Sequence, residues 1–222
     1  NAVEKLIFGE IKICGINSVE NARKVMATPA SYMGLIFATK SPRYVSLERA
    51  MEIASLATSK KRVGVFLDNP IEVVADYARK LTLAAVQLHG NESIEYMQTL
   101  RTLLPESCEI WAVESVLQTQ ADLTVFIAHT LAPKLEVADK VLLDCKIGDQ
   151  VGGTGATFNW RLLEDVPQKH KLILAGGLAP SNIQAARKTQ VAILDVNSGV
   201  EESPAEKSES KLSSLFASLR EY

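Results

Sequence analysis

The chain has 222 residues, of which 47% are hydrophobic, so it is long enough for one large domain with a sizeable core. Its formal net charge is −2 and its charges are interspersed, which leaves no basic stripe for nucleic acid and no polybasic patch for a membrane. The sequence contains no apolar run of the roughly 20 residues that span a bilayer, and its N-terminal segment NAVEKLIFGEIK does not resemble a secretory signal.

Short apolar, β-branched segments alternate along the chain with amphipathic segments. The former predict strands at 10–14, 32–37, 61–66, 84–88, 108–113, 139–144, 171–175 and 192–196. The latter predict helices near 18–28, 46–59, 70–80, 92–104, 119–129, 158–165, 180–189 and 207–220. Ser18, Ser46 and Ser181 stand at the expected helix starts, where a hydroxyl can cap the first turn.

Strand-then-helix repetition indicates a parallel sheet, and the strands lack clean alternation, as expected when both faces are covered. Repeats without a break in composition favour closure, so we expect an α/β fold, a single (β/α)8 TIM barrel over residues 1–222. The alternative is an open doubly wound sheet, which is disfavoured because no GxGxxG motif follows the first strand.

Glycines gather in the loops after the last three expected strands. Barrels often bind phosphate there, because glycine lets backbone N–H groups approach the phosphate oxygens closely. The sequence therefore predicts a small phosphorylated substrate, although tight turns alone would also explain the pattern. The residues expected at this seat are Gly153, Gly155, Gly176, Gly177, Asn197, Ser198 and Gly199.

Cys14 ends the first expected strand, at the end of the barrel where active sites lie. Strand alternation puts Lys12 on the same side, and a lysine inside a barrel needs a partner. The eighth strand adjoins the first once a barrel closes, so Asp195 is the expected partner. Because a nearby cation lowers the pKa of a thiol, we hypothesise that Lys12 tunes Cys14 as a general base.

Asp144 ends the sixth expected strand, across the barrel mouth from Cys14. Two titratable groups that flank a pocket can act as acid and base, although Asp144 could instead cap its loop. Arg43 could clamp a substrate carboxylate with two hydrogen bonds, or be a solvated loop charge. His89 is expected to support the site through hydrogen bonds, or to be only structural.

The cysteine and histidine patterns suggest neither disulfides nor a metal. There are three of each, without a CxxC or CxxxH spacing, which describes neither a disulfide framework nor a zinc site. We therefore expect a reduced, cytoplasmic protein that uses no metal and no cofactor. Because the chain starts at Asn1, we also expect a processed or excised piece of a longer protein.

The motifs at these positions resemble the phosphoribosylanthranilate isomerase family of tryptophan biosynthesis, and they occur in the family's order over nearly the whole chain. They are KICG (12–15), GLIFATKSPRYVS (34–46), VGVF (63–66), VQLHG (86–90), LLD (142–144), GGTG (152–155), LAGGL (174–178) and LDVNSGVE (194–201).

The resemblance implies an Amadori rearrangement of N-(5-phosphoribosyl)anthranilate to 1-(2-carboxyphenylamino)-1-deoxyribulose 5-phosphate. It implies that Asp144 protonates the furanose ring oxygen and that Cys14 removes the proton from sugar C2. It further implies that Arg43 holds the anthranilate carboxylate and that the last glycine loops hold the phosphate.

The sequence departs from the family where a segment like PGxKD usually follows SGVE, because residues 204–208 read PAEKS here. The leading segment LIFGEIKICG resembles the junction of bifunctional enzymes in which this isomerase follows an indole-glycerol-phosphate synthase domain. Two rival interpretations are the related aminoaldose isomerase of histidine biosynthesis, which uses two aspartates, and a catalytically silent partner barrel. The cysteine at position 14 disfavours the first, and the presence of both Cys14 and Asp144 disfavours the second.

Overall fold

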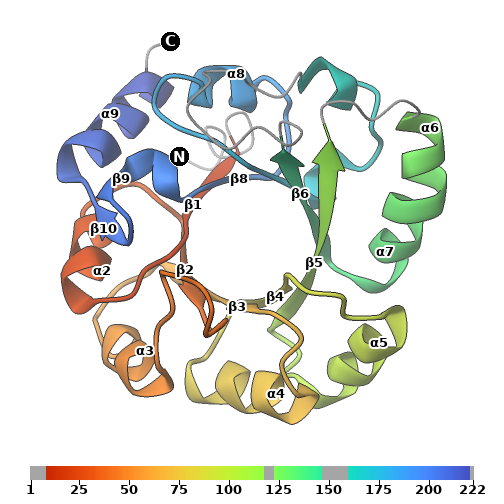
Figure 1. Cartoon of the computed structure of the whole chain (residues 1–222), viewed down its shortest axis with the longest axis horizontal. Coiled ribbons are helices and arrows are strands. Elements are labelled where there is room, and N and C mark those ends of the chain that lie inside the picture. The colour runs from red at the N-terminus through yellow and green to blue at the C-terminus, as the bar shows by residue number, and fades with distance from the viewer. Residues whose placement is uncertain (1–8, 118–122, 147–159, 221–222) are drawn as a thin grey trace.

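Eight parallel strands form a closed barrel in chain order, and Figure 1 looks into the opening of this barrel. The structure, a computed structural model, describes residues 9–117, 123–146 and 160–220. The strands are β1 (Glu10–Ile13), β2 (Tyr32–Ile36), β3 (Lys61–Phe66), β4 (Ala85–Leu88), β5 (Glu109–Leu117), β6 (Lys140–Lys146), β7 (Leu172–Ala175) and β8 (Ile193–Val196). Because β8 pairs with β1, the predicted (β/α)8 barrel is confirmed and the open sheet was the wrong alternative.

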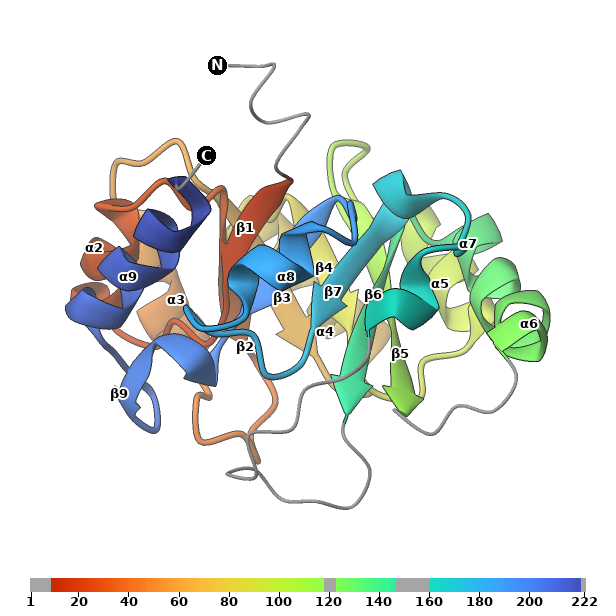
Figure 2. The same cartoon turned by 90° about the horizontal axis from the view of Figure 1, so that it is seen from above.

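Helices surround the ring of strands on its outer side (Figures 1 and 2). They are α2 (Val19–Met26), α3 (Leu47–Ala54), α4 (Ile71–Lys80), α5 (Ile94–Leu103), α6 (Leu123–Phe126), α7 (Ala132–Val137), α8 (Ile183–Arg187) and α9 (Glu209–Arg220). Short 3-10 turns occupy Trp160–Leu163 (η2), Lys169–Lys171 (η3) and Ser198–Val200 (η4), and a two-stranded hairpin of β9 (Glu201–Ser203) and β10 (Glu206–Lys207) precedes α9. Over the described residues, every helix is too short or too polar to cross a membrane.

Two of the three predicted helix caps are confirmed. The Ser18 side chain accepts from the Asn21 amide, and that of Ser46 accepts from the Arg49 amide. The cap at Ser181 is wrong, because α8 begins one residue later, after Asn182. The side chain of Asn182 closes a turn instead, accepting from the Ala179 amide at 2.8 Å.

The helix expected at 119–129 is wrong in its limits, because the helical segment between β5 and β6 extends to Val137. A π-helical turn, η1 (Ile127–Leu131), joins α6 to α7, and the Ala132 amide bonds to the Ile127 carbonyl five residues back. This wider turn carries the chain past Pro133, which has no N–H to donate and would interrupt a regular helix. The helix expected at 158–165 is represented within the described residues by the short turn η2.

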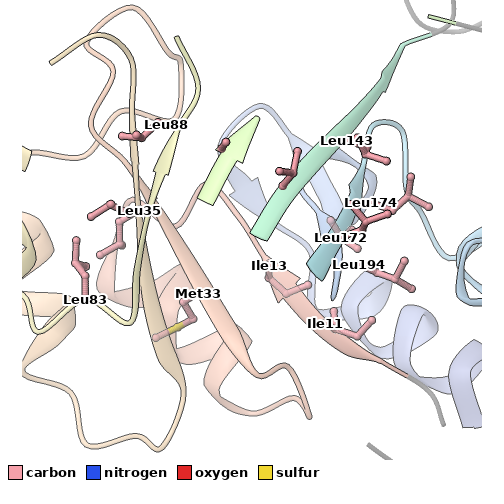
Figure 3. Packing of buried hydrophobic residues seen from close by; sticks show 14 of the residues in the cluster. Ile11, Ile13, Met33, Leu35, Leu83, Leu88, Leu143, Leu172, Leu174 and Leu194 are labelled. Carbon is pink, nitrogen blue, oxygen red and sulfur yellow. The ribbon is translucent and has the colours of Figure 1, made fainter. Parts of the chain in front are cut away.

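The core is divided by the sheet into an outer and an inner part. The outer part joins strands to helices, and Figure 3 shows its aliphatic side chains, among them Ile11 and Ile13 of β1. The inner part fills the ring around Trp111, which packs edge-on against Tyr32 at 5.4 Å between ring centroids. Because β1 alternates, its neighbouring side chains at 12 and 14 point into the barrel, where the polar groups described next are held.

Candidate active site

An open cavity of 380 Å³ lies at the carboxyl-terminal end of the barrel, the end at which the strand arrows of Figure 2 terminate. Side chains from β2, β3, β4, β6, β7 and β8 line it, together with residues that follow β1, β2, β3, β4, β7 and β8. Cys14 and Asp144 both line it, so the expectation that both face the barrel mouth is confirmed. The other lining residues are Ile36, Ala38, Ser41, Val65, Leu67, Gln87, His89, Ala175, Gly176, Gly177, Leu178, Asp195, Asn197 and Ser198.

Lys12 lies fully buried beneath the cavity. Its ammonium group donates to Gln87 Oε1 at 2.7 Å and to Asp195 Oδ2 at 3.2 Å, which confirms the predicted pairing with Asp195. Burial alone would lower the pKa of Lys12, but the charges of Asp195 and Cys14 raise it above its ordinary value. Lys12 is therefore a fixed positive charge inside the barrel.

The Cys14 thiol is 5% exposed and in contact with this charged group. Burial raises the pKa of Cys14 above its ordinary value, while the charge of Lys12 opposes that rise. Lys12 thus lowers the pKa of Cys14, as expected from the sequence, although the larger effect of burial leaves that pKa above its ordinary value. The thiol is therefore mainly protonated at neutral pH in this arrangement.

Asp144, on β6, is linked to the same buried lysine through two intervening side chains. Its Oδ2 lies 3.9 Å from His89 Nε2, and His89 Nδ1 lies 3.3 Å from Gln87 Nε2. Lys12 only donates, so the Gln87 carbonyl must face Lys12 and the Gln87 amide group must face the histidine. Nδ1 of His89 is then the acceptor, which leaves the ring proton on Nε2, toward Asp144.

Arg43 does not line the cavity but lies across the backbone of Gly15, next to Cys14. Gly15 has a φ of +80°, and a Cβ there would come within 2.7 Å of Arg43 Cδ, so only glycine fits beneath this side chain. The guanidinium donates from Nε and Nη2 to the two carboxylate oxygens of Glu201, at 2.9 and 2.6 Å. These hydrogen bonds raise the pKa of Arg43 further.

The glycines expected at the phosphate seat divide into three groups. Gly176 and Gly177, with φ of +104° and +68°, line the cavity, and the space beside Gly177 is open. Gly199 instead packs the loop after β8 onto the loop after β7, because a Cβ there would lie 1.9 Å from the Leu178 carbonyl oxygen. Gly153 and Gly155 lie outside the described residues.

Four residues of the site were not singled out from the sequence: Gln87, Glu201, Lys207 and Gly34. A Cβ on Gly34 would lie 2.6 Å from Cys14 Sγ, so this glycine makes the space for the thiol; its signal was a glycine inside a buried strand. Glu201 and Lys207 carry no periodic signal, because each is defined by partners distant in the chain. Over the described ranges, His, Cys, Asp and Glu side chains form no cluster of three that could hold a metal ion.

A closed parallel barrel with a thiol and a carboxyl group at its carboxyl-terminal mouth places the chain among the (β/α)8 barrels whose cavity carries groups suited to acid–base chemistry. Residues 11–218 match the family model described as N-(5'phosphoribosyl)anthranilate (PRA) isomerase. The chain therefore belongs to the N-(5'-phosphoribosyl)anthranilate isomerase family, which confirms the family expected from its motifs.

Curated relatives and solved structures agree with this assignment. "Tryptophan biosynthesis protein TrpCF" of Vibrio cholerae is 41% identical over 221 residues, which cover 100% of this chain and 44% of the relative. The protein of that name from Helicobacter pylori strain J99 is 41% identical over 218 residues, or 98% of this chain and 45% of the relative. The chain thus spans less than half the length of these relatives.

Among solved structures, phosphoribosyl anthranilate isomerase from Thermotoga maritima matches with a TM-score of 0.80 and 31% identity, covering 96% of this chain and 100% of that one. A phosphoribosyl anthranilate isomerase in complex with reduced 1-(o-carboxyphenylamino)-1-deoxyribulose 5-phosphate matches with a TM-score of 0.78 and 29% identity, over the same shares of the two chains.

Proposed function

We propose that this chain catalyses the Amadori rearrangement of N-(5-phosphoribosyl)anthranilate to 1-(2-carboxyphenylamino)-1-deoxyribulose 5-phosphate, a step of tryptophan biosynthesis. The observation that carries the proposal is the meeting of Cys14 and Asp144 in one cavity beside Gly176 and Gly177. The family match and a relative solved with the reduced product support the same substrate.

In the proposed reaction, Asp144 donates a proton to the furanose ring oxygen as the bond from that oxygen to C1 breaks. The nitrogen lone pair completes a C1=N iminium ion. The thiolate of Cys14 then removes the proton from C2, and the C2–H electrons neutralise the iminium as an enolamine. Tautomerisation of the enolamine gives the ketone, so no external oxidant or reductant is needed.

Each candidate group has a neighbour suited to its role. Lys12 supplies the positive charge that favours a thiolate at Cys14. His89 presents its Nε2 toward Asp144, where it stabilises the carboxylate left after proton donation. We assign Arg43 to the substrate carboxylate, and the phosphate to the loop amides near Gly177 and Ser198.

The test is turnover of N-(5-phosphoribosyl)anthranilate by the parent chain, followed by Cys14→Ser and Asp144→Asn. We expect activity in the parent and a loss of about 100-fold or more in kcat for each variant, the range typical of acid–base groups. A parent without activity would support the silent barrel. Turnover of the histidine-pathway aminoaldose instead would support the rival isomerase.

We further propose that residues 1–222 form one barrel domain joined in the natural protein to an indole-glycerol-phosphate synthase domain. The support is that matching relatives are more than twice as long as the matched segment. The three free cysteines, all buried, favour the reducing cytoplasm as its location. Sequencing the intact gene tests the fusion directly, and one uninterrupted reading frame encoding this chain alone would contradict it.

A further inference from the structure

Glu201, the first residue of β9, is a buried carboxylate held between two cations. Its side chain is 3% exposed, and it accepts from Arg43 and from Lys207, which is itself fully buried. Burial would raise the pKa of Glu201, but its hydrogen bonds and charge partners lower the pKa below its ordinary value. The carboxylate is therefore charged throughout the neutral range.

The two hydrogen bonds to Glu201 use one particular edge of the Arg43 guanidinium. Nε and Nη2 form the side edge, and both donate to the carboxylate, so the planar group cannot rotate without breaking one of them. The terminal edge, formed by Nη1 and Nη2, keeps its remaining N–H groups for another acceptor. A carboxylate is the acceptor whose geometry matches that edge.

Lys207 fixes Glu201 from the opposite side. Its ammonium group donates to Glu201 Oε2 at 3.0 Å and to the backbone and side-chain oxygens of Asn197 at 3.2 and 3.1 Å. Asn197 lines the cavity, so the Lys207 ammonium group links Glu201 directly to the cavity wall. One anion between two cations leaves a net positive charge, which suits an anionic substrate group.

We propose that Glu201, fixed by Lys207, is a positioning residue that holds Arg43 with its terminal edge ready for the substrate carboxylate. The inference rests on the proposed function, since it assigns the part of that substrate which Arg43 binds. Pre-orientation matters because an unrestrained arginine would lose side-chain entropy on every binding event. Glu201 itself touches no reacting atom.

The experiment compares Glu201→Gln with the parent on two substrates: N-(5-phosphoribosyl)anthranilate and N-(5-phosphoribosyl)aniline, which lacks the carboxylate. With the first, we expect KM to rise about tenfold and kcat to stay within about twofold, because carboxylate binding is lost equally in the ground and transition states. With the second, KM of variant and parent should agree. Glu202→Gln, which removes an exposed neighbouring charge, is the matched control and should behave as the parent does.

Three results would overturn the proposal. An unchanged KM means that Arg43 needs no support, and an equal rise with both substrates means that Glu201 is only structural. A fall in KM means that Glu201 competes with the substrate for Arg43. A parent that turns over neither substrate contradicts the proposed function instead, so the two failures are distinguishable.

A second variant guards against poor folding, since Glu201→Gln leaves Lys207 without its anionic partner. Glu201→Asp keeps the charge beside Lys207 but shortens the reach toward Arg43 by one methylene. The proposal predicts weaker binding of the reduced product by calorimetry at an unchanged melting temperature. Unchanged affinity in Glu201→Asp would contradict it.

Discussion

Lys12 and Asp195 face each other across the seam where the barrel closes, on β1 and β8, with 3.2 Å between Nζ and Oδ2. The second oxygen of Asp195, Oδ1, is buried and has no hydrogen-bond partner among the described residues. Asp195 also lines the cavity. The ion pair therefore connects the two strands that close the barrel, and one of its members lines the candidate site.

Replacing Lys12 by Met should shift the pH dependence of kcat/KM. The pKa of the Cys14 thiol is already raised by burial, and Lys12 is the largest influence opposing that rise. Without the cation, thiolate forms only at higher pH, so the acidic limb of the profile should move to higher pH. Lys80→Met, which removes an exposed charge on α4, should leave the profile in place. An unmoved limb in Lys12→Met would remove Lys12 from the mechanism.

Gly34→Ala, which adds a methyl group, should lower kcat more than it lowers the stability of the fold. The new Cβ would lie 2.6 Å from Cys14 Sγ and 3.1 Å from Lys12 Cε, so both side chains must move. We expect kcat to fall about 10- to 100-fold, because displacement of a catalytic group by an ångström costs that much. Steady-state kinetics on folded protein is the measurement.

The matched control for Gly34→Ala is Gly64→Ala on β3. Its Cβ would meet Leu83 and Phe66 at 2.7 and 2.8 Å, in the outer core. Overpacking there should cost roughly 1–3 kcal/mol of stability while kcat of the folded protein is kept. Equal losses of kcat in both variants would show that Gly34 has no special relation to the thiol.

Ala205→Gly should stabilise the protein. Ala205 has a φ of +70° in the turn between β9 and β10, at the position where the family pattern PGxKD has glycine. Glycine removes the steric cost of this conformation, although it also increases the entropy of the unfolded chain, so we expect a net gain of roughly 0.5–1 kcal/mol by urea unfolding. Ala27→Gly, at an exposed residue with a φ of −76°, should lower stability instead. A gain in both variants would mean that backbone strain at Ala205 is not the cause.

Cys14 should be the first of the three cysteines to be alkylated by iodoacetamide. Burial raises the pKa of all three thiols, to about 12 for Cys108 and Cys145, but only Cys14 opens onto the cavity. Its rate should rise about tenfold per pH unit over pH 6.5–8.5, because the reactive thiolate is the minor form there. Mass spectrometry of quenched samples gives the order of labelling. Alkylation of Cys145 before Cys14 would contradict this placement. So would a Cys14 alkylation rate that the reduced product does not lower.

Most strands could be predicted closely because their signal is local: each is a short apolar, β-branched run between turn residues. The strand expected at 192–196 is found at Ile193–Val196, for example. The strand expected at 108–113 is the exception, because β5 extends to Leu117. The end of the helical segment before β6 was not predicted, because a π-helical turn carries the chain past Pro133, where a regular helix would be interrupted. Local pattern contains no information on such a change of hydrogen-bond register.

The site was predictable to the extent that it follows from strand alternation and barrel closure. Those two rules placed Lys12 beside Asp195, and Cys14 at the mouth of the barrel. They could not reveal that Arg43 is held by Glu201, because 158 residues separate the two and both lie in loops or hairpins that no period describes. Burial of a charged side chain depends on tertiary packing, which pattern alone does not encode.

The pairing of β1 with β8 also sets when, in the life of the molecule, the site comes into existence. Cys14 leaves the ribosome before Asp195 and Glu201, which are synthesised almost two hundred residues later. Since their meeting requires most of the described chain to close into one loop, we expect it to be a slow and late event in folding. We therefore expect Cys14 to gain its neighbours of the candidate site only when β8 docks against β1.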